Sequence, residues 1–119
     1  MKNQIIIGAF FGLIAAFSFR AHAGTLIAKE SQWHAWPGNQ APSAETLKWV
    51  EFDFNDSEWS KGSAPFRYGD GAGGTEINGM RNTYSTYCLR RHFSVDSVSL
   101  VEGLELNIDY DDGFVVWLN

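Results

Sequence analysis

Three carboxylates near the C-terminus are the first candidates for chemistry, because Asp109, Asp111 and Asp112 lie almost side by side. Clustered carboxylates supply the oxygen ligands that calcium prefers, but the spacing here does not match the regular positions of an EF-hand loop. Asp112 is followed by Gly113, and Asp-Gly is a preferred pair for a tight hairpin turn because glycine adopts φ > 0 without steric cost. The sequence therefore favours a hairpin turn over a calcium site.

A glycine-rich stretch, residues 69–74 with the sequence GDGAGG, matches the spacing G-x-G-x-x-G. In dinucleotide-binding proteins this motif follows a strand and opens a helix whose N-terminus holds the pyrophosphate. The residues that follow, EING at 76–79, show no helical pattern. We therefore interpret the stretch as a flexible turn between strands.

The two histidines that follow the N-terminal segment, His34 and His92, lack the paired spacing of a zinc site. The sequence contains no G-x-S-x-G nucleophile motif. Its many carboxylates fit an acidic surface as well as a catalytic pair. The sequence therefore predicts a protein that is not an enzyme and that carries no cofactor and no metal site.

The tryptophans are more informative than these groups. Five of them follow the N-terminal segment: Trp33, Trp36, Trp49, Trp59 and Trp117. An aromatic ring can stack on a sugar ring, or it can fill the core of a small domain. We expect Trp49, Trp59 and Trp117 to be core residues. Trp36 precedes Pro37-Gly38 and is expected to be exposed.

The elements that position these side chains follow a segment with the features of a secretory signal peptide. Lys2 gives it a positive start, residues 5–19 are apolar, and Ala-His-Ala at 21–23 offers a cleavage site. The apolar run is shorter than the ~20 residues that a membrane span requires. The sequence therefore predicts a signal peptide over residues 1–23. It also predicts a secreted, periplasmic or cell-surface domain over residues 24–119, with no membrane span after cleavage.

The charge of residues 24–119 bears on the possible partners. This part of the chain carries 7 Lys and Arg against 14 Asp and Glu, a formal charge of −7. Nonspecific nucleic-acid binding requires Lys and Arg to neutralise phosphates, so nucleic acid is not an expected partner. Cys88 is the single cysteine, so the chain cannot form an internal disulfide. Arg90 and His92 share its side of a predicted strand, and we expect the thiol to be partly exposed.

Composition and periodicity indicate an all-β domain. Aromatic residues make up 15% of the chain and 12 residues are glycine, a composition that suits strands and turns better than helices. Alternating and apolar runs predict strands over residues 25–28, 49–54, 87–95, 104–110 and 114–118, the last of them covered on both faces. Residues 36–42 and 62–79 are predicted loops, and residues 43–50 a loop with one helical turn.

Four runs of the sequence together resemble one family. They are FNDSEW at 54–59, APFRYGDG at 64–71, YCLRRHF at 87–93 and YDDGFVVWLN at 110–119. In order and spacing they are similar to the galactose-binding-domain-like modules of large secreted bacterial proteins. The similarity covers most of residues 33–119. Phe66-Arg67 and Cys88 depart from the usual pattern.

The resemblance implies a jelly-roll β-sandwich. Asn119 lies where the family continues into further strands, so we expect an incomplete sandwich and further domains downstream in the same polypeptide. The resemblance also implies a non-catalytic secreted binding module, with a carbohydrate or a surface glycan as its ligand. The alternative is a structural or accessory domain that packs against a catalytic domain, glycosidase-like or phosphoesterase-like, of a longer secreted protein.

The site predictions follow from these runs and from the tryptophans. Trp36, Tyr68 and Asp70 are the candidate ligand-binding residues. Asp56 and Ser57 are expected to cap local backbone N–H groups. Trp59 is expected to anchor their loop to the core.

Overall fold

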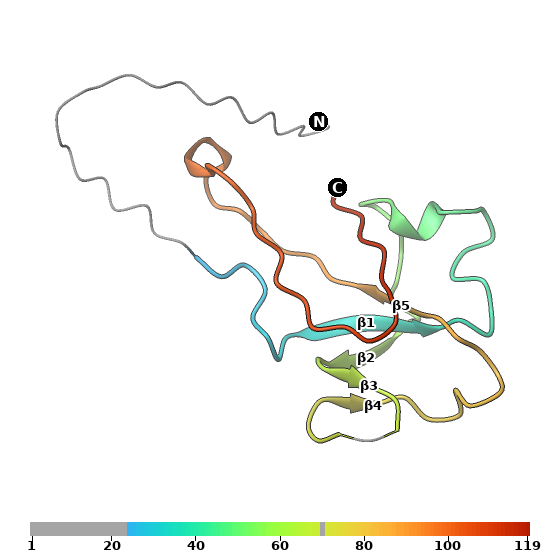
Figure 1. Cartoon of the computed structure of the whole chain (residues 1–119). Helices are drawn as coiled ribbons and strands as arrows, with labels where there is room; N and C mark the ends of the chain where they lie inside the picture. Colours follow the sequence, from blue (N-terminus) through green and yellow to red (C-terminus); the bar gives the residue numbers. More distant parts are fainter. Residues whose placement is uncertain (1–23, 70) are drawn as a thin grey trace, which may run out of the picture.

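The computed structural model describes residues 24–69 and 71–119, so the predicted signal peptide and the candidate residue Asp70 lie outside the described residues. The described chain contains five strands in two sheets and two short 3-10 helices (Figure 1). This arrangement confirms the prediction of an all-β protein.

The larger sheet has three strands in the order β2-β1-β5. The central strand, β1 (Gln32–Pro37), pairs antiparallel with β2 (Ser60–Ser63) on one side and with β5 (Tyr87–Arg90) on the other. The prediction of a loop over residues 36–42 is therefore wrong at its start, because Trp36 and Pro37 belong to β1. Proline is tolerated here because it ends the strand, where its missing N–H removes no interior hydrogen bond of the ladder.

The register of this sheet assigns neighbouring β1 side chains to opposite faces. His34 is the Cα partner of Lys61 in β2 and of Arg90 in β5. Partners across an antiparallel ladder project to the same face, so these three form one polar row. Ala35 projects to the opposite face, where it is 1% exposed. The sheet therefore buries one face at Ala35 and carries charge on the other.

A second, parallel sheet joins β3 (Phe66–Arg67) to β4 (Thr75–Glu76). It packs close to β2 at Gly62. A methyl group at Gly62 would lie 2.5 Å from the hydroxyl oxygen of Thr75 and 2.8 Å from a ring carbon of Phe66. Glycine is therefore required where β2 meets this second sheet. The predicted loop 62–79 thus contains these two short strands.

The first helical segment, η1 (Lys48–Val50), confirms the helical turn predicted within residues 43–50. The strand predicted over residues 49–54 is wrong. The carbonyl oxygens of Trp49, Glu51 and Phe54 accept hydrogen bonds from the guanidinium of Arg90 rather than from a neighbouring strand. The alternating apolar pattern belongs to a loop whose backbone surrounds a cation.

The core is small and aromatic. Trp59 is 6% exposed, as predicted for the anchor of its loop. The ring centroids of Trp36, Trp49 and Phe54 lie 5.8, 6.0 and 5.9 Å from that of Trp59. We call these four residues the aromatic cluster. Trp36 is half-buried within it, so the prediction that Trp36 is exposed is wrong.

Strand β5 is shorter than the strand predicted over residues 87–95. Its ladder with β1 ends at the pair His34 and Arg90. Beyond this pair, the guanidinium of Arg91 donates a hydrogen bond to the carbonyl oxygen of Gln32. A side chain thus takes the place of further backbone pairing. The strand predicted over residues 25–28 is wrong as well. The first strand of the described chain, β1, begins at Gln32.

Cys88 is half-buried on β5, which confirms the expected partial exposure. Burial raises the pKa of its thiol above the ordinary value. The thiolate is the reactive form of cysteine, so this burial lowers the fraction of Cys88 that can react at neutral pH.

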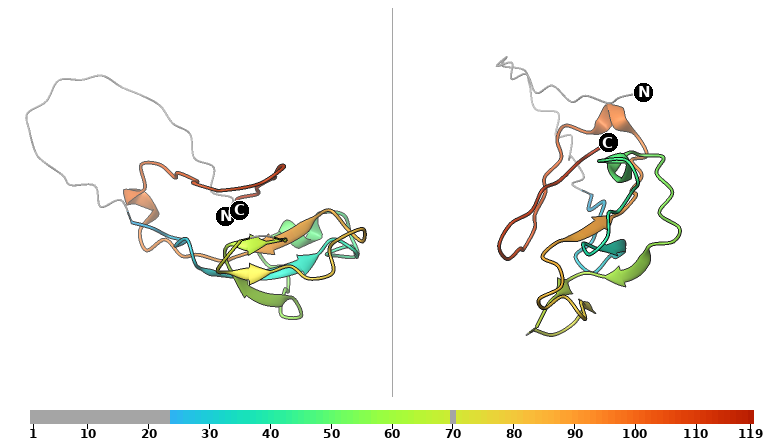
Figure 2. Two further views of the ribbon diagram at one scale, coloured as in Figure 1. Left: turned by 60° about the horizontal axis from the view of Figure 1, so that its bottom comes forward. Right: turned by 90° about the vertical axis from the view of Figure 1, so that its right-hand side faces the viewer.

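The C-terminal segment, residues 101–119, follows η2 (Val98–Leu100) as an extended chain that turns near Asp112 and returns towards η1 (Figure 1). It contains no strand, and both views of Figure 2 draw it without one. The strands predicted over residues 104–110 and 114–118 are therefore wrong. The turn itself is present, but the left-handed conformation falls on Asp112, with φ 70, and not on Gly113.

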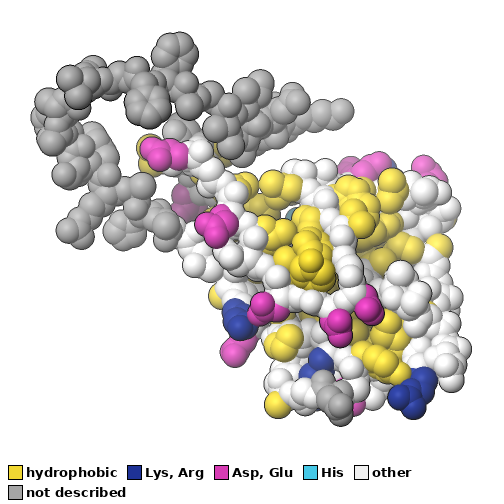
Figure 3. All heavy atoms as spheres, in the orientation of Figure 1, with side chains coloured by type: hydrophobic (Ala, Val, Ile, Leu, Met, Phe, Trp, Pro, Cys, Tyr) yellow, Lys and Arg dark blue, Asp and Glu magenta, His cyan; other side chains and the backbone are white. Residues whose placement is uncertain are grey.

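The same segment exposes its apolar side chains. Val115 is 72% exposed and Trp117 is 43% exposed, so the predictions of a doubly covered strand and of a core Trp117 are wrong. Within residues 24–69 and 71–119, no strand pairs with this segment to cover it. Its end packs back on η1, where the rings of Trp117 and Trp49 meet edge-on at 5.2 Å. Figure 3 shows the hydrophobic side chains that gather on this face of the molecule.

Candidate functional site

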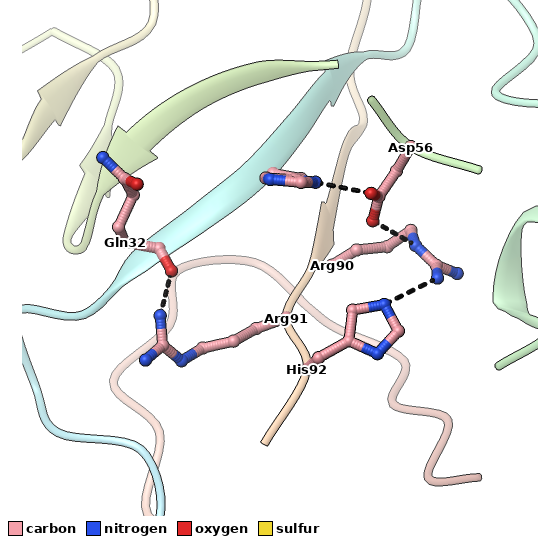
Figure 4. Close-up of a pocket in the computed structure, with 6 residues that line it drawn as sticks. Gln32, Asp56, Arg90, Arg91 and His92 are labelled. Atoms are coloured by element: carbon pink, nitrogen blue, oxygen red, sulfur yellow. Dashed lines mark hydrogen bonds and ion pairs between the residues drawn. The ribbon is translucent and has the colours of Figure 1, made fainter. Parts of the chain in front are cut away.

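A hollow of about 230 Å³ opens on the charged face of the larger sheet. It is lined by residues of β1, of the loop before β2, and of the end of β5 with the two residues that follow it: Gln32, His34, Asp56, Arg90, Arg91 and His92. We call it the polar hollow. Figure 4 shows the Asp56 carboxylate between two basic side chains, with Arg91 reaching across to Gln32.

Asp56 is the buried acid of the polar hollow and holds two bases. Its Oδ1 lies 2.6 Å from Nδ1 of His34, and its Oδ2 accepts a hydrogen bond of 2.9 Å from Nε of Arg90. The side chains of Asp56 and Arg90 are 11% and 9% exposed. Charges at this depth are stable only when they are paired and hydrogen-bonded. The pair therefore ties β5 to the loop that precedes β2.

This arrangement corrects the role predicted for Asp56. The local cap belongs to Asn55, whose Oδ1 accepts a hydrogen bond of 3.1 Å from the backbone N–H of Ser57. Asp56 instead reaches across the fold to β1 and β5. A polar residue in a turn commonly bonds the nearby backbone. Because Asn55 fills that role here, the Asp56 carboxylate is available to pair with His34 and Arg90.

Arg90 is a structural cation rather than a free binding group. Besides Asp56 and the three carbonyls of the loop, it meets the ring of Phe54, whose centroid lies 5.2 Å from the guanidinium carbon. A guanidinium over an aromatic face is attracted by the ring quadrupole. Its Nη2 also lies 3.5 Å from Nε2 of His92. These contacts engage the N–H groups of Arg90, so the groups of the hollow that can bind a ligand belong to other lining residues.

The ionisation of Asp56 is set by two opposing effects. Burial of the Asp56 carboxyl raises its pKa, but the hydrogen bonds from Arg90 and His34 outweigh burial and hold the pKa below the ordinary value of 3.8. The carboxylate is therefore charged at neutral pH. Because the folded pKa is lowered, this group stabilises the fold at neutral pH, and the stabilisation is lost as the pH falls through the folded value.

Arg91 is the arginine of the polar hollow that no carboxylate neutralises among the described residues. Its Nη1 donates to the carbonyl oxygen of Gln32. Its Nε is buried and has no hydrogen-bond partner within the described part of the chain. Arg91 is thus held in place by one neutral contact and retains donors for a ligand.

The rim of the polar hollow adds ring faces and ring nitrogens. His92 is exposed, and its ring meets the ring of Phe52 edge-on at 5.5 Å. Phe52 is 70% exposed. With Nδ1 of His34 held by Asp56, Nε2 is the ring nitrogen of His34 that remains for another partner. The site therefore combines hydrogen-bonding groups with an exposed aromatic ring.

The residues predicted to bind a ligand do not line this hollow. Trp36 packs in the aromatic cluster, and its Nε1 donates to the carbonyl oxygen of Gln40 at 3.1 Å. Tyr68 is 47% exposed and lies just after β3, where its hydroxyl accepts a hydrogen bond of 3.1 Å from Nε of Arg81. Asp70 lies outside the described residues.

The sequence does not predict the lining residues as a binding set. The spacing of His34 and His92 argues only against a zinc site, and the sequence assigns Asp56 to a local cap. The available signal is the polar run Arg90-Arg91-His92 at the end of an otherwise half-buried strand. Such groups are buried only when they meet partners, so the run indicates a polar site nearby without locating it.

The arrangement offers hydrogen-bond donors and acceptors to a bound molecule. A histidine whose Nδ1 is held by a carboxylate resembles the orienting half of a nucleophile triad. The lining residues described here include no serine, threonine, cysteine or lysine that could be the nucleophile. Within residues 24–69 and 71–119, no group of three or more His, Cys, Asp or Glu side chains is arranged to hold a metal ion.

Comparisons with known proteins add no assignment. Protein-family models, curated proteins and solved structures gave no match to this chain. In the described residues, no helix has the length and apolar character that crossing a membrane requires.

Proposed function

We propose that this chain is a non-catalytic, secreted carbohydrate-binding module of the galactose-binding-domain-like, jelly-roll type, and that the polar hollow is its ligand site. The observation that carries the proposal is the juxtaposition of His34, Arg91 and His92 with the exposed ring of Phe52. The site thus differs from the one expected around Trp36, Tyr68 and Asp70.

Both halves of this juxtaposition match the chemistry of a sugar. Sugar hydroxyls both donate and accept hydrogen bonds, and the imidazole and guanidinium groups of the hollow offer fixed partners for them. The C–H face of a sugar ring is apolar and stacks on an aromatic ring, so an exposed Phe52 offers a platform beside these donors. A small number of placed polar groups with an aromatic wall is the usual composition of a small-molecule site.

Replacing Phe52 with alanine is expected to weaken glycan binding about tenfold, because the stacking surface is lost while the hydrogen-bonding groups remain. Binding is measured on a glycan array and then by calorimetric titration with the best oligosaccharide. Phe114→Ala is the matched control, because Phe114 is also exposed, at 46%, and its ring packs on Tyr110, which does not line the hollow. Equal binding by Phe52→Ala and the parent chain would contradict the assignment of the site.

A second candidate function is supported by the C-terminal segment. Contiguous apolar surface on a secreted domain indicates contact with another protein surface, and this segment exposes Leu106 at 61% and Val115 at 72%. We propose as the alternative that the chain is an accessory domain that packs against a catalytic domain of a longer secreted protein. Failure of the chain to bind any glycan on the array would favour this alternative.

A further inference from the structure

We propose that the ligand of the polar hollow is an acidic saccharide and that Arg91 binds its carboxylate. This inference rests on the proposed function, because it names the class of sugar that the same site takes. It is carried by the charge balance of the hollow and by the donors that Arg91 has left.

The charge balance favours an anion. Arg90 and Asp56 neutralise each other at 2.9 Å, so the charge of Arg91 remains. Its hydrogen-bond partner among the described residues, the carbonyl oxygen of Gln32, is uncharged. Residues 24–119 carry a formal charge of −7, yet the permanent charges that line this hollow sum to a positive value. A positive site on an acidic domain attracts an anionic group while the surrounding surface repels nonspecific anions.

The donors of Arg91 favour a carboxylate in particular. Nη1 is engaged by Gln32, which leaves Nε and Nη2 on the adjacent edge of the guanidinium. Two parallel N–H groups on one edge match the two oxygens of a carboxylate. Nε is buried without a partner among the described residues, and a buried N–H without a partner is destabilising. A carboxylate oxygen that displaced the atoms covering Nε would supply the missing acceptor.

The rest of the hollow suits the remainder of such a ligand. With the carboxylate on Arg91, Nε2 of His34 and Nδ1 of His92 are the ring nitrogens left for the sugar hydroxyls, because Asp56 and Arg90 engage the other two. Phe52, which meets His92 edge-on at 5.5 Å, lies on the rim for the face of the sugar ring. A uronic acid carries all three features on one ring: a carboxylate, hydroxyls and an apolar face.

The test is a calorimetric titration of the purified chain with three matched probes: an oligogalacturonate, its methyl ester and the corresponding neutral galactan oligomer. We expect the acid to bind about tenfold more tightly than the ester, because a charge-assisted bidentate contact is lost on esterification. Arg91→Gln is expected to remove this preference. Arg91→Lys is expected to reduce it, because lysine keeps the charge but lacks the two parallel N–H groups. Lys29→Gln is the control for charge alone, since Lys29 is 85% exposed.

The possible outcomes separate the two proposals. Equal binding of acid, ester and neutral oligomer would overturn this inference and leave the proposed function standing. A preference for the acid that survives in Arg91→Gln would also overturn it, as would equal binding of a sulfated galactan oligomer. Failure of all these probes together with every glycan on the array would overturn the proposed function itself. Thermal unfolding of each variant, followed by tryptophan fluorescence, verifies that a loss of preference does not come from a loss of fold.

Discussion

Replacing Asp56 with asparagine is expected to lower the free energy of unfolding by about 3 kcal/mol, because it leaves a buried guanidinium without its counter-charge. Arg90 is 9% exposed and donates to the Asp56 carboxylate at 2.9 Å. Breaking one member of such a pair is more harmful than removing both, since the remaining charge cannot reach water. Urea unfolding followed by tryptophan fluorescence at neutral pH measures the change.

Asp53→Asn provides the matched control for this substitution, because Asp53 is exposed and the chemical change is the same. Substitutions of this kind at the surface change the free energy of unfolding by no more than about 0.5 kcal/mol. The pH dependence has a definite sign as well. The pKa of Asp56 is lowered in the folded chain, so the difference between the parent chain and Asp56→Asn should persist above about pH 5 and shrink as the pH falls below about 4. A difference that is absent at neutral pH, or that grows in acid, would contradict the buried pair.

Replacing Trp59 with alanine is expected to lower the free energy of unfolding by about 4 kcal/mol, which is comparable with the whole stability of a small domain. Trp59 is 6% exposed and is the ring that Trp36, Trp49 and Phe54 all contact. Removal of its side chain opens a cavity in the aromatic cluster that its neighbours can fill only in part. We expect near-ultraviolet circular dichroism to show the loss of fixed aromatic packing at 25 °C.

Trp117→Ala is the control for this second prediction. Trp117 is 43% exposed and touches the aromatic cluster at one member, Trp49. Its removal is expected to cost less free energy of unfolding than the removal of Trp59, because 43% of Trp117 stays in contact with water and its loss opens no enclosed cavity. If Trp117→Ala and Trp59→Ala destabilised the chain equally, the assignment of the core to the aromatic cluster would be wrong.

The sequence predicted the fold class because composition and turn chemistry are local properties. Trp59 could be predicted as an anchor, and the helical turn within residues 43–50 could be placed, since both depend on a few neighbouring residues. The central strand β1 was not recognised, because Trp33, His34, Ala35 and Trp36 show no clean alternation of apolar and polar side chains. Both faces of β1 are partly covered, and a period of two is a signal of strands with one wet face.

The apolar runs near the C-terminus illustrate the opposite error. The alternation over residues 104–110 predicts a strand, but a strand requires a neighbour for its backbone N–H and C=O groups. Among the described residues no such neighbour is present, and the segment remains extended and exposed. Periodicity thus predicts which side chains could be buried, whereas burial also requires a partner surface.

The site could not be read from the sequence for a related reason. Asp56 and Arg90 are 34 positions apart, and Gln32 and Arg91 are 59 positions apart. These contacts arise from the antiparallel register of β1 with β5, which brings His34 level with Arg90. No local spacing encodes that register. The motif FNDSEW indicated where Asp56 lies along the chain but not which residues it contacts.

The central claim is that a saccharide binds at the polar hollow beside Phe52. The most direct test is a titration of the ¹⁵N-labelled chain with the tightest-binding oligosaccharide from the array, followed by backbone and arginine side-chain NMR spectra. The account predicts that the largest chemical-shift changes fall on His34, Phe52, Arg91 and His92, with the Nε–H signal of Arg91 among them. Changes centred instead on Tyr68 and the glycine turn at 69–74, or a spectrum that the sugar leaves unchanged, would contradict it.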